Sequence, residues 1–361
     1  LVKAFGKSRS FPSVRDLLQS EAAQWIKLLH PLFLCSPYSV ARSLPITTKF
    51  DLVIFDEASQ IPLPHALGSV HRGTRIVIAG DQQQMAPQFY FQKKSTQSSD
   101  LLHQASFYWK NTMLTNHYRS VHADLIAFSN RYFYQNKLKP YPSPIQNKAI
   151  EVIQVDGTFI DRKNEKEAKI VADLITAKLK NGEKDFGLVA FSQTQLSAIL
   201  DNLSADHQNQ LLEEEADYFV QSLENVQGDQ CNHLIISMGY APNEEGDFHM
   251  RFGPLNQEQG HRRLNVLMSR SKSKITFVRS VKAEDFSISD NDGVELLRKL
   301  MLFLEEEHND LDQQLGDHIT LNVSIGKLSI RQPQNAFGSS VGLVNYYNVM
   351  VSRGWDVDFL V

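Results

Sequence analysis

The chain has 361 residues, of which 42% are hydrophobic and 10% aromatic, which is enough for about two or three folded domains. Its 37 basic and 41 acidic residues give a net charge of -4, so no global positive field attracts nucleic acid or membranes. The two cysteines, Cys35 and Cys231, lack metal-ligand spacing and suit a reducing cytosol, so both thiols are expected to be packing residues. No apolar run approaches the roughly 20 residues of a membrane span, so we expect a cytoplasmic protein with no membrane partner.

Short apolar runs alternate with amphipathic stretches along the chain. The predicted strands are FDLVIF, TRIVIAG, EVIQV, FGLVAF, HLIISMGY and KITFVRS, and stretches such as 164–181 and 192–203 have helical periodicity. Apolar strands without polar alternation are typical of a parallel sheet that helices cover on both faces. The sequence therefore predicts an α/β protein.

The order of these elements predicts four segments. A first block, 1–111, ends near Trp109, and a second α/β block spans 112–283. Segment 284–316 contains a loop, a helix that Asp292 is expected to cap, and an acidic linker. In 317–361 short strands and a helix around 340–353 form a small α/β tail of unknown role, a candidate further domain or partner-docking unit.

Two adjacent acids end the strand FDLVIF. Asp56 and Glu57 follow it directly, and Gln60 comes three residues later. In an open parallel sheet, ligands bind at the carboxyl ends of the strands. One carboxylate can hold Mg²⁺, largely through its waters, while its neighbour polarises an attacking water. Taken alone, the acids also fit an ordinary strand end that runs out to solvent.

The next predicted strand also ends on polar residues. TRIVIAGDQQQMAP continues from its apolar run into Gly80 and Asp81, and Gln84 follows. Gly80 permits a tight turn, and the amide of Gln84 can donate to a phosphate oxygen and accept from a positioned water. Two neighbouring strands that both finish in this way favour a nucleotide site over two ordinary loops.

These segments and four later ones resemble, in the same order, the motifs of superfamily 1 helicases. DEASQ resembles motif II, GDQQQMAP motif III, LTNHYRS at 114–120 motif IV, FGLVAFSQTQ at 186–195 the strand and turn after it, SLENVQGDQCNHLIISMGY at 222–240 motif V, and GHRRLNVLMSRSK at 260–272 motif VI. FGPLN at 252–256 resembles in particular the bacterial branch of the RNA-decay-helicase-like group. The resemblance covers residues 31 to about 280. It implies two RecA-like parallel-sheet lobes of a P-loop NTPase helicase core, the first one incomplete.

The resemblance also implies roles for individual residues. Catalysis would use Glu57, Gln84 and two arginine fingers, Arg119 and Arg270, whose planar guanidinium groups suit a γ-phosphate across the cleft between the lobes. The alternative for each arginine is a surface ion pair. ATP and Mg²⁺ would be the cofactors, with Asp56 as the metal ligand and Asp56, Gln60, Gly80, Asp81, Gln227 and Gly228 around the nucleotide.

The implied nucleic-acid contacts come from two further segments. Ser36 and Tyr38 in CSPYSVARSL at 35–44 would meet the phosphate backbone and a base of single-stranded DNA or RNA, and Ser222 of motif V would also touch the backbone. An electrostatic groove could draw on a basic cluster, namely Arg251, His261, Arg262, Arg263, Lys272 and Lys274. A loop that leads into a helix N-terminus fits 35–44 equally well.

A phosphate-binding loop is not recognisable in the chain. In LVKAFGKS, Gly6, Lys7 and Ser8 match the last three positions of such a loop, but no strand precedes them and Pro12 interrupts the helix that should follow. We therefore interpret the match as coincidence. Because residue 1 is Leu rather than Met, the chain is expected to be a fragment that hydrolyses little ATP alone.

Three functions are compatible with these residues. The first is an ATP-dependent helicase or translocase on nucleic acid, in which hydrolysis between two RecA-like domains drives movement along a single strand. The second is a degenerate, non-enzymatic RecA-like module that binds nucleic acid or protein, which is favoured by Gln230 at a position where the family usually has Glu. Gln259 likewise stands where relatives often have Gly. The third, a Mg²⁺ nuclease, would need carboxylates from further strands.

Overall fold

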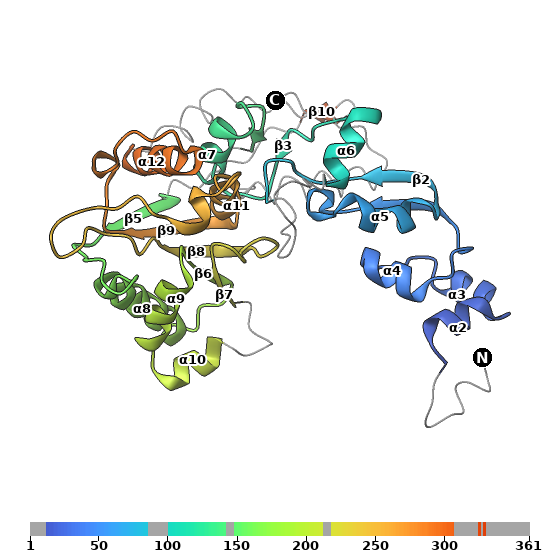
Figure 1. Cartoon of the computed structure of the whole chain (residues 1–361), viewed down its shortest axis with the longest axis horizontal. Coiled ribbons are helices and arrows are strands. Elements are labelled where there is room, and N and C mark those ends of the chain that lie inside the picture. Colours follow the sequence, from blue (N-terminus) through green and yellow to red (C-terminus); the bar gives the residue numbers. More distant parts are fainter. Residues whose placement is uncertain are drawn as a thin grey trace. The chain divides into compact units, whose positions relative to one another are not determined.

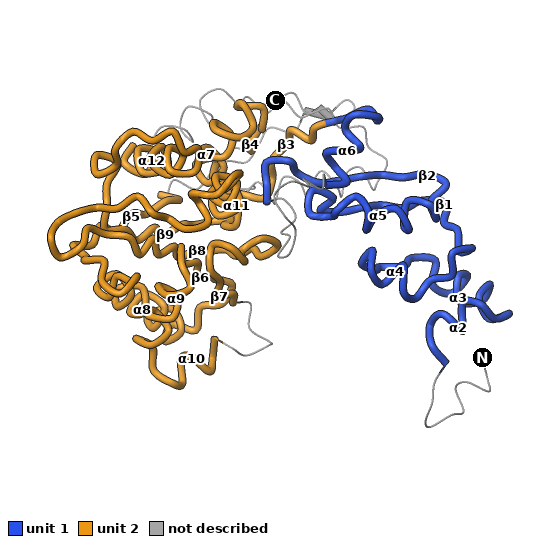
Figure 2. The backbone as a smooth tube through the Cα atoms, viewed as in Figure 1, with its two compact units in different colours: residues 1–112 blue, residues 113–361 orange. Residues whose placement is uncertain are grey.

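The computed structural model describes residues 12–85, 100–141, 148–211 and 218–306. It also gives the backbone of two short antiparallel strands in the tail, β10 (Ser324–Ile325) and β11 (Leu328–Ser329). The chain divides into two compact units, unit 1 (Leu1–Thr112) and unit 2 (Met113–Val361), which Figure 2 shows in different colours. The incomplete phosphate-loop match at Gly6, Lys7 and Ser8 and the predicted helix around 340–353 lie outside the described residues.

Unit 1 is built around one parallel β-α-β unit. Its elements are α2 (Val14–Gln19), α3 (Ala23–Leu29), α4 (Pro37–Ser43), β1 (Phe50–Phe55), η1 (Ala58–Gln60), α5 (Leu63–Val70), β2 (Gly73–Ile78) and α6 (Leu101–Tyr108). Strands β1 and β2 pair in parallel, with Phe50 opposite Gly73 and Phe55 opposite Ile78. The first two predicted strands are therefore confirmed, and their carboxyl ends lie side by side.

Helices of unit 1 cover one face of this two-stranded sheet. Phe55 packs with Ala58, Ala66 and Leu101 in a small buried core. On the other face, the side chains of Leu52, Ile54 and Val77 are exposed. The prediction of a sheet covered on both faces is thus not met here among the described residues, because α5 and α6 pack against the alternate side chains only.

Unit 2 contains a five-stranded, fully parallel sheet of order β5-β9-β8-β6-β7. Its strands are β5 (Ile150–Gln154), β6 (Phe186–Ala190), β7 (Tyr218–Ser222), β8 (Cys231–Ser237) and β9 (Ser271–Arg279). The four strands predicted in this segment are confirmed. Edge strand β7 was not predicted, because four of its five residues are half-buried and its end is polar rather than uniformly apolar.

Helices cover both faces of the unit 2 sheet (Figure 1). One layer contains α8 (Glu165–Lys180), α9 (Gln193–Asp201) and α10 (Ala205–Leu211), and the other contains α7 (Asp124–Tyr132), α11 (Arg262–Met268) and α12 (Asp292–Glu305). Short elements complete the unit, namely β3 (Asn116–His117), β4 (Lys139–Pro140), η2 (Gly253–Asn256) and η3 (Ala283–Asp285). The result is a RecA-like α/β core, as the sequence predicts.

Helix α12 belongs to unit 2, although the sequence pattern set it apart with the acidic segment. Leu297 and Leu300 are fully buried, and the ring of Phe303 lies 5.6 Å from that of Phe128 in α7. The expected cap was wrong by one residue. Asn291 is the N-cap, because its extended backbone leaves Oδ1 free to accept from the next two amides, and Asp292 is the first helical residue.

Two further expectations concern the cysteines and membranes. Cys231 is buried in β8, as expected of a packing residue, but Cys35 is exposed on the segment that leads into α4. The expectation was wrong for Cys35 because no described element covers this segment. Within the described ranges, no helix combines the length and apolar character that crossing a bilayer requires.

Candidate functional site

The acids after β1 form a tight, exposed turn. Glu57 has left-handed backbone angles, φ 51 and ψ 39, and its amide donates to Oδ1 of Asp56 at 2.9 Å. Its carboxylate accepts from Nε2 of Gln60 at 3.2 Å. A left-handed residue other than glycine costs about 1–2 kcal/mol, and such strain is typical of functional turns. The turn thus presents two carboxylates to solvent at the carboxyl end of the sheet.

The turn after β2 packs directly against the turn after β1. A Cβ on Gly80 would lie 3.0 Å from the amide nitrogen of Ala58 and 3.1 Å from that of Ser59, so a larger residue would push the turns apart. The amide of Ala58 donates to the carbonyl of Ala79 at 2.9 Å. The structure therefore brings motifs II and III together, and a Cβ at position 80 would require the neighbouring amides to shift by a few tenths of an ångström.

Gln84 is held by the same turn. The carboxylate of Asp81 accepts from the backbone amide of Gln83 at 2.8 Å and from Nε2 of Gln84 at 3.1 Å. This arrangement leaves the amide oxygen of Gln84 available as an acceptor. A side chain fixed in this way can orient a water molecule without large loss of entropy.

Asp56 is the residue that could hold a metal ion here. No group of three or more His, Cys, Asp or Glu side chains within the described ranges could form a closed metal cage. Mg²⁺ commonly binds through one or two carboxylates, completed by water and substrate phosphates. An exposed carboxylate at a strand end fits that kind of site, and it does not fit a structural metal.

Arg119 lies in a turn between β3 and α7 of unit 2. Its side chain is exposed, and it forms no hydrogen bond or ion pair with another described residue. Two residues later, the amide of Val121 donates to the carbonyl of Lys272 at 2.7 Å, which ties this turn to the start of β9. Motif IV therefore lies beside the end of motif VI within the same unit.

Arg270 has a different environment. It is only 4% exposed, and its guanidinium donates to the carbonyls of Val266 and Asp229 and to the hydroxyl of Ser269, at 2.9, 3.2 and 3.1 Å. These bonds join the end of α11 to the loop before β8. In this conformation the side chain stabilises the fold and does not reach outward, so its role as an arginine finger stays a prediction.

The motif V turn after β7 contains a buried donor without a partner. Gly228 has φ 101, which only glycine adopts readily, and Nε2 of the preceding Gln227 is buried with no hydrogen-bond partner among the described residues. Nε of Arg263 is also buried with no hydrogen-bond partner among the described residues. Burial lowers the pKa of this guanidinium, and the charge of Glu224 opposes the shift. Orphaned donors of this kind suit an oxygen-rich ligand.

The predicted nucleic-acid residues fall into two groups. Tyr38 is exposed, whereas the Ser36 hydroxyl caps α4 by accepting from the amide of Ser39 at 3.2 Å. Ser222 is buried at the end of β7, and Nδ2 of Asn225 donates to its hydroxyl at 3.5 Å. This geometry does not support a direct strand contact by Ser222 without movement of the loop.

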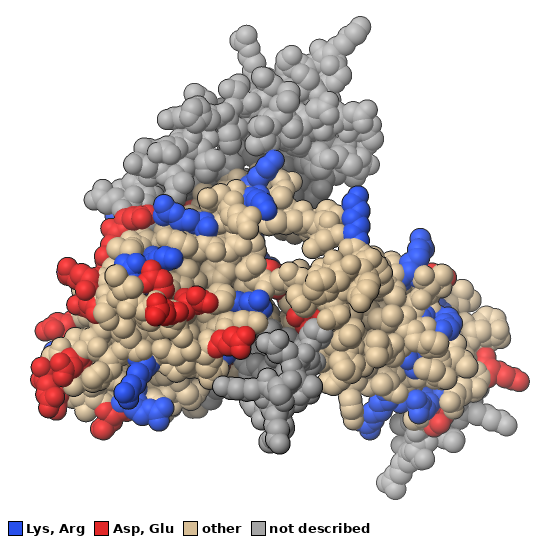
Figure 3. All heavy atoms as spheres, turned by 45° about the horizontal axis from the view of Figure 1, so that its top comes forward, with Lys and Arg blue, Asp and Glu red and all other residues tan. Residues whose placement is uncertain are grey.

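The predicted basic cluster does not form a continuous charged surface. Lys274 is paired with Glu151 at 2.7 Å, and the ring of His261 stacks on that of Phe133. Figure 3 shows Lys, Arg, Asp and Glu interspersed over the visible face of unit 2. The structure therefore does not support a single electrostatic groove formed by the predicted basic cluster, namely Arg251, His261, Arg262, Arg263, Lys272 and Lys274.

A buried polar network at the ends of β8 and β9 was not predicted. Glu167 is fully buried, and its carboxylate accepts from the hydroxyl of Ser237 at 2.8 Å, the amide of Gly239 at 2.7 Å and the hydroxyl of Ser280 at 3.3 Å. Burial raises the pKa of Glu167 to about 7, and these hydrogen bonds only partly oppose the shift. The sequence signal was a single Glu on the apolar side of the helix 164–181.

The segment FGPLN at 252–256 has a packing role. Nδ2 of Asn291 donates to the carbonyl of Asn256 at 2.8 Å, so the motif holds the start of α12. A Cβ on either Gly260 or Gly293 would collide with the carbonyl of Leu255. Both glycines are therefore required by close backbone approach to η2.

Comparisons with known proteins give a consistent family. An AAA domain family matches residues 152–282. An uncharacterized ATP-dependent helicase of Mycoplasma genitalium is 30% identical over 318 residues, covering 78% of this chain and 28% of that protein. Its homolog in Mycoplasma pneumoniae is 29% identical over 330 residues, covering 81% of this chain and 29% of that protein. These matches support the resemblance of the chain to superfamily 1 helicases.

The chain is also similar to more distant proteins. The DNA replication ATP-dependent helicase/nuclease DNA2 of Gallus gallus is 25% identical over 289 residues, covering 75% of this chain and 26% of that protein. Among solved structures, an arterivirus helicase matches with a TM-score of 0.34 and 10% identity over 74% of this chain and 55% of that chain, a likeness too low to carry any detail. The chain spans less than a third of the length of these curated relatives.

Proposed function

We propose that this chain contributes to an ATP-dependent helicase or translocase that moves along single-stranded DNA or RNA. One observation carries the proposal: the turns after β1 and β2 are packed together through Gly80 and present Asp56, Glu57 and Gln84 at the carboxyl ends of two neighbouring parallel strands. The similarity to these relatives adds support, because they are named as ATP-dependent helicases.

Each candidate site residue of unit 1 has a specific role in this proposal. Glu57 accepts a proton from the attacking water, and the amide oxygen of Gln84, held by Asp81, orients that water. Asp56 would hold Mg²⁺, which when bound neutralises phosphate charge. Gln60 donates to Glu57 and keeps its carboxylate in place.

Unit 2 contributes the positive charge and the remaining contacts. Arg119 is the exposed guanidinium that can stabilise charge on the transferred phosphoryl group, an effect worth roughly 10³ to 10⁵ in rate. The orphaned Nε2 of Gln227, beside Gly228, supplies a donor for the nucleotide. Arg270 would need to leave its carbonyl partners to act in the same way.

The isolated chain is proposed to hydrolyse ATP poorly. The sequence contains no strand followed by a complete phosphate-binding loop, and the partial match at 1–8 lies outside the described residues. Backbone N–H groups of such a loop provide most of the binding energy for the phosphates of a nucleotide. We therefore propose ATP hydrolysis for the helicase to which this chain contributes and not for the chain alone.

A degenerate binding module is the second candidate. It is favoured by the burial of Arg270 on backbone carbonyls and by Gln230 in motif V. Such a module would bind nucleic acid with a steep salt dependence and without any effect of nucleotide.

The test is ATP hydrolysis by the full gene product in the presence of a single strand. Glu57→Gln should lower kcat by about 10² to 10⁴ through loss of the base. Asp51→Asn, which removes an exposed acid from the same strand β1, is the matched control and should keep the wild-type rate. Equal rates for wild type and Glu57→Gln would exclude the helicase function and leave the binding module.

A further inference from the structure

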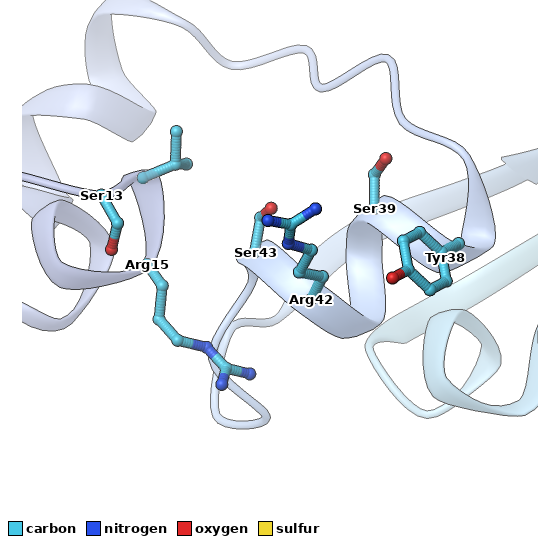
Figure 4. A pocket seen from close by; sticks show the side chains of 7 residues that line it. Ser13, Arg15, Tyr38, Ser39, Arg42 and Ser43 are labelled. Carbon is cyan, nitrogen blue, oxygen red and sulfur yellow. The ribbon is translucent and has the colours of Figure 1, made fainter.

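The carboxyl group of Glu167 is enclosed by protein, whereas polar side chains of unit 1 are open to solvent. In unit 1, Tyr38 and Arg42 are exposed at a hollow of about 350 Å³ between α2 and α4, where water can solvate a charge (Figure 4). Glu167 in α8 is 0% exposed, and within the described part of the chain it forms no ion pair. A buried carboxylate without a cation is costly, so the neutral groups around it decide whether it keeps its proton.

The two oxygens of this carboxyl group are bonded unequally. Oε1 accepts from the hydroxyl of Ser237 at 2.8 Å and from the amide of Gly239 at 2.7 Å. Oε2 lies 3.3 Å from the hydroxyl of Ser280 and 3.4 Å from Nδ2 of Asn164, and both are long contacts. The proton of the neutral form therefore belongs on Oε2, where it can be donated to Oγ of Ser280 while Oε1 keeps both short bonds.

Two amide side chains fix the geometry around the carboxyl group. The backbone amide of Asn164 donates to Oε1 of Gln195 at 2.8 Å. In return, Nε2 of Gln195 donates to the carbonyl of Asn164 and to Oγ of Ser237, both at 3.2 Å. A Cβ on Gly157 would collide with the Asn164 side chain, and one on Gly239 would collide with that of Gln195. The frame is closely packed, so the proton on the carboxyl group is its variable part.

Charged side chains near the start of α8 are engaged by other groups. Nζ of Lys163 pairs with Glu165 at 2.9 Å, and Nζ of Lys166 donates to the carbonyl of Asp156 at 2.8 Å. Burial raises the pKa of Glu167 to about 7, and hydrogen bonds from neutral groups oppose the shift. The titratable groups on the other elements packed against α8 are Asp201 of α9, Cys231 and His233 of β8, Tyr240 just after β8, and Lys272, Lys274 and Arg279 of β9, the last of which pairs with Glu305.

The same carboxyl group attaches two strand-end segments to the start of α8. Among the described residues, the amide of Gly239 donates to Oε1 of Glu167 and to no backbone carbonyl. Gly239 has φ 74 and begins the segment that runs from the end of β8 to η2 and then to α11. Ser280 begins the segment that follows β9. The attachment of both segments therefore depends on one ionisable group.

We propose that Glu167 is a proton-dependent clamp, which holds the segments after β8 and β9 on α8 while it is protonated and releases them when it ionises. Release follows because an ionised carboxylate is stabilised by water, which reaches it only when these segments move away. The closed form binds the proton more tightly than the open form, so opening increases as pH rises. The clamp does not rest on the proposed function, because it needs neither ATP nor a nucleic acid.

Hydrogen–deuterium exchange of this chain between pH 6 and 9 tests the clamp. The protection factor of the Gly239 amide removes the ordinary pH dependence of exchange. With a pKa of about 7 in the closed form and the ordinary 4.5 in the open form, the opening constant should rise about 10-fold from pH 6 to pH 8 and level off above it. Low urea concentrations should leave this protection unchanged and lower that of Ile235 within β8, because a local opening exposes little surface.

Three variants separate the proton of Glu167 from other effects of pH. Glu167→Gln keeps an acceptor for both short bonds and places an amide donor toward Ser280, so the clamp should stay closed at every pH. Ser237→Ala removes a donor that favours the ionised form, so the midpoint of opening should move to higher pH. Asp173→Asn changes an exposed acid on the same helix and is the matched control, which should follow wild type.

Carbon-13 NMR of the chain with carboxyl-labelled glutamate measures the protonation directly. The resonance that is absent from Glu167→Gln should titrate with a midpoint near 7, and a midpoint at or below 4.5 would overturn the clamp. Protection of the Gly239 amide that is equal in wild type and a folded Glu167→Gln at every pH would also overturn it. If circular dichroism shows that Glu167→Gln is unfolded, the wild-type series and the midpoint of Ser237→Ala decide. Equal urea dependence of the Gly239 and Ile235 amides would mean that the segments open only on global unfolding, which contradicts a clamp.

Discussion

Nε2 of His117 accepts a hydrogen bond from the backbone amide of Ser120 at 3.3 Å and lies 2.9 Å from the hydroxyl of the same residue. These contacts close a four-residue turn in which Tyr118 and Arg119 are exposed. An accepting nitrogen requires a neutral ring, and burial, followed by the charge of Arg119, lowers the pKa of His117 to about 4. The imidazole is therefore a fixed support for the proposed arginine finger.

Replacing this support should change catalysis without changing nucleotide binding. His117→Leu removes the acceptor, so Arg119 loses its orientation, and we expect kcat of the full gene product to fall about 10-fold or more with little change in KM for ATP. His117→Asn, which restores an acceptor oxygen, should recover part of the rate. In an Arg119→Ala background, His117→Leu should have no further effect; an additive loss would show that His117 acts elsewhere.

The two proposed arginine fingers should differ in their effect on stability. Arg270→Ala removes a buried guanidinium that donates to the carbonyls of Val266 and Asp229, and we expect the free energy of unfolding to fall by about 3 kcal/mol. Arg119→Ala removes an exposed side chain and should stay within about 0.5 kcal/mol of wild type. Urea unfolding of this chain measures both. Similar losses for the two variants would show that Arg270 is not the structural residue described above.

Glu167 should make stability depend on pH in a defined direction. Its folded pKa of about 7 exceeds the ordinary 4.5, so its contribution is fully present below pH 4.5 and is lost as pH rises through 7. Relative to Glu167→Gln, wild type should lose roughly 3 kcal/mol of unfolding free energy between these limits, an order-of-magnitude value. Taking the difference between the two proteins removes the opposite trend of His117 and His233, whose pKa values are lowered.

Urea unfolding at several pH values tests this prediction. Glu258→Gln changes an exposed acid of the same unit and should run parallel to wild type across the range. If the unfolding free energy of Glu167→Gln also changes with pH in parallel with wild type, the carboxylate of Glu167 does not titrate in this window. The buried network would then not cause the pH dependence.

Gln259 and Gly260, where motif VI begins, should respond to substitution in opposite ways. Glycine at position 259 should stabilise the protein, and alanine at position 260 should destabilise it. Gln259 has φ 59, so Gln259→Gly relieves a left-handed strain and should raise the free energy of unfolding by about 0.5–1 kcal/mol. Gly260→Ala places a methyl group against the carbonyl of Leu255 and should lower it by several kcal/mol. Thermal unfolding measures both shifts; a destabilised Gln259→Gly would mean that the Gln259 side chain makes a contact worth more than the strain.

Gly80 gives a comparable test in unit 1. Gly80→Ala inserts a methyl group between the turns after β1 and β2, about 3 Å from the amides of Ala58 and Ser59. We expect ATPase activity of the full gene product to fall at least 10-fold. Gly68→Ala in α5, whose added methyl would have ordinary contact distance to Arg72, is the control and should be silent. Wild-type activity in Gly80→Ala would show that the contact between the two turns does not affect ATP hydrolysis.

The sequence by itself determined the strands, their parallel pairing and the positions where polar residues end them. Uninterrupted apolar runs such as FGLVAF and HLIISMGY have few alternatives to a buried parallel strand, so β6 and β8 could be predicted from composition alone. The order of the motif segments likewise indicates the resemblance to superfamily 1 helicases. Edge strand β7 escaped because half-buried edges carry mixed residues.

Only the tertiary structure decided which of the singled-out side chains are free to act. Arg119 and Arg270 look equivalent as motif arginines, but one is exposed and the other is buried and bonded to the carbonyl of Asp229, in a loop 41 residues away in sequence. The same holds for Glu167, whose partners come from the ends of β8 and β9. Periodicity specifies which face of an element is buried, whereas hydrogen-bond partners from distant strands depend on how those elements pack, which no local pattern encodes.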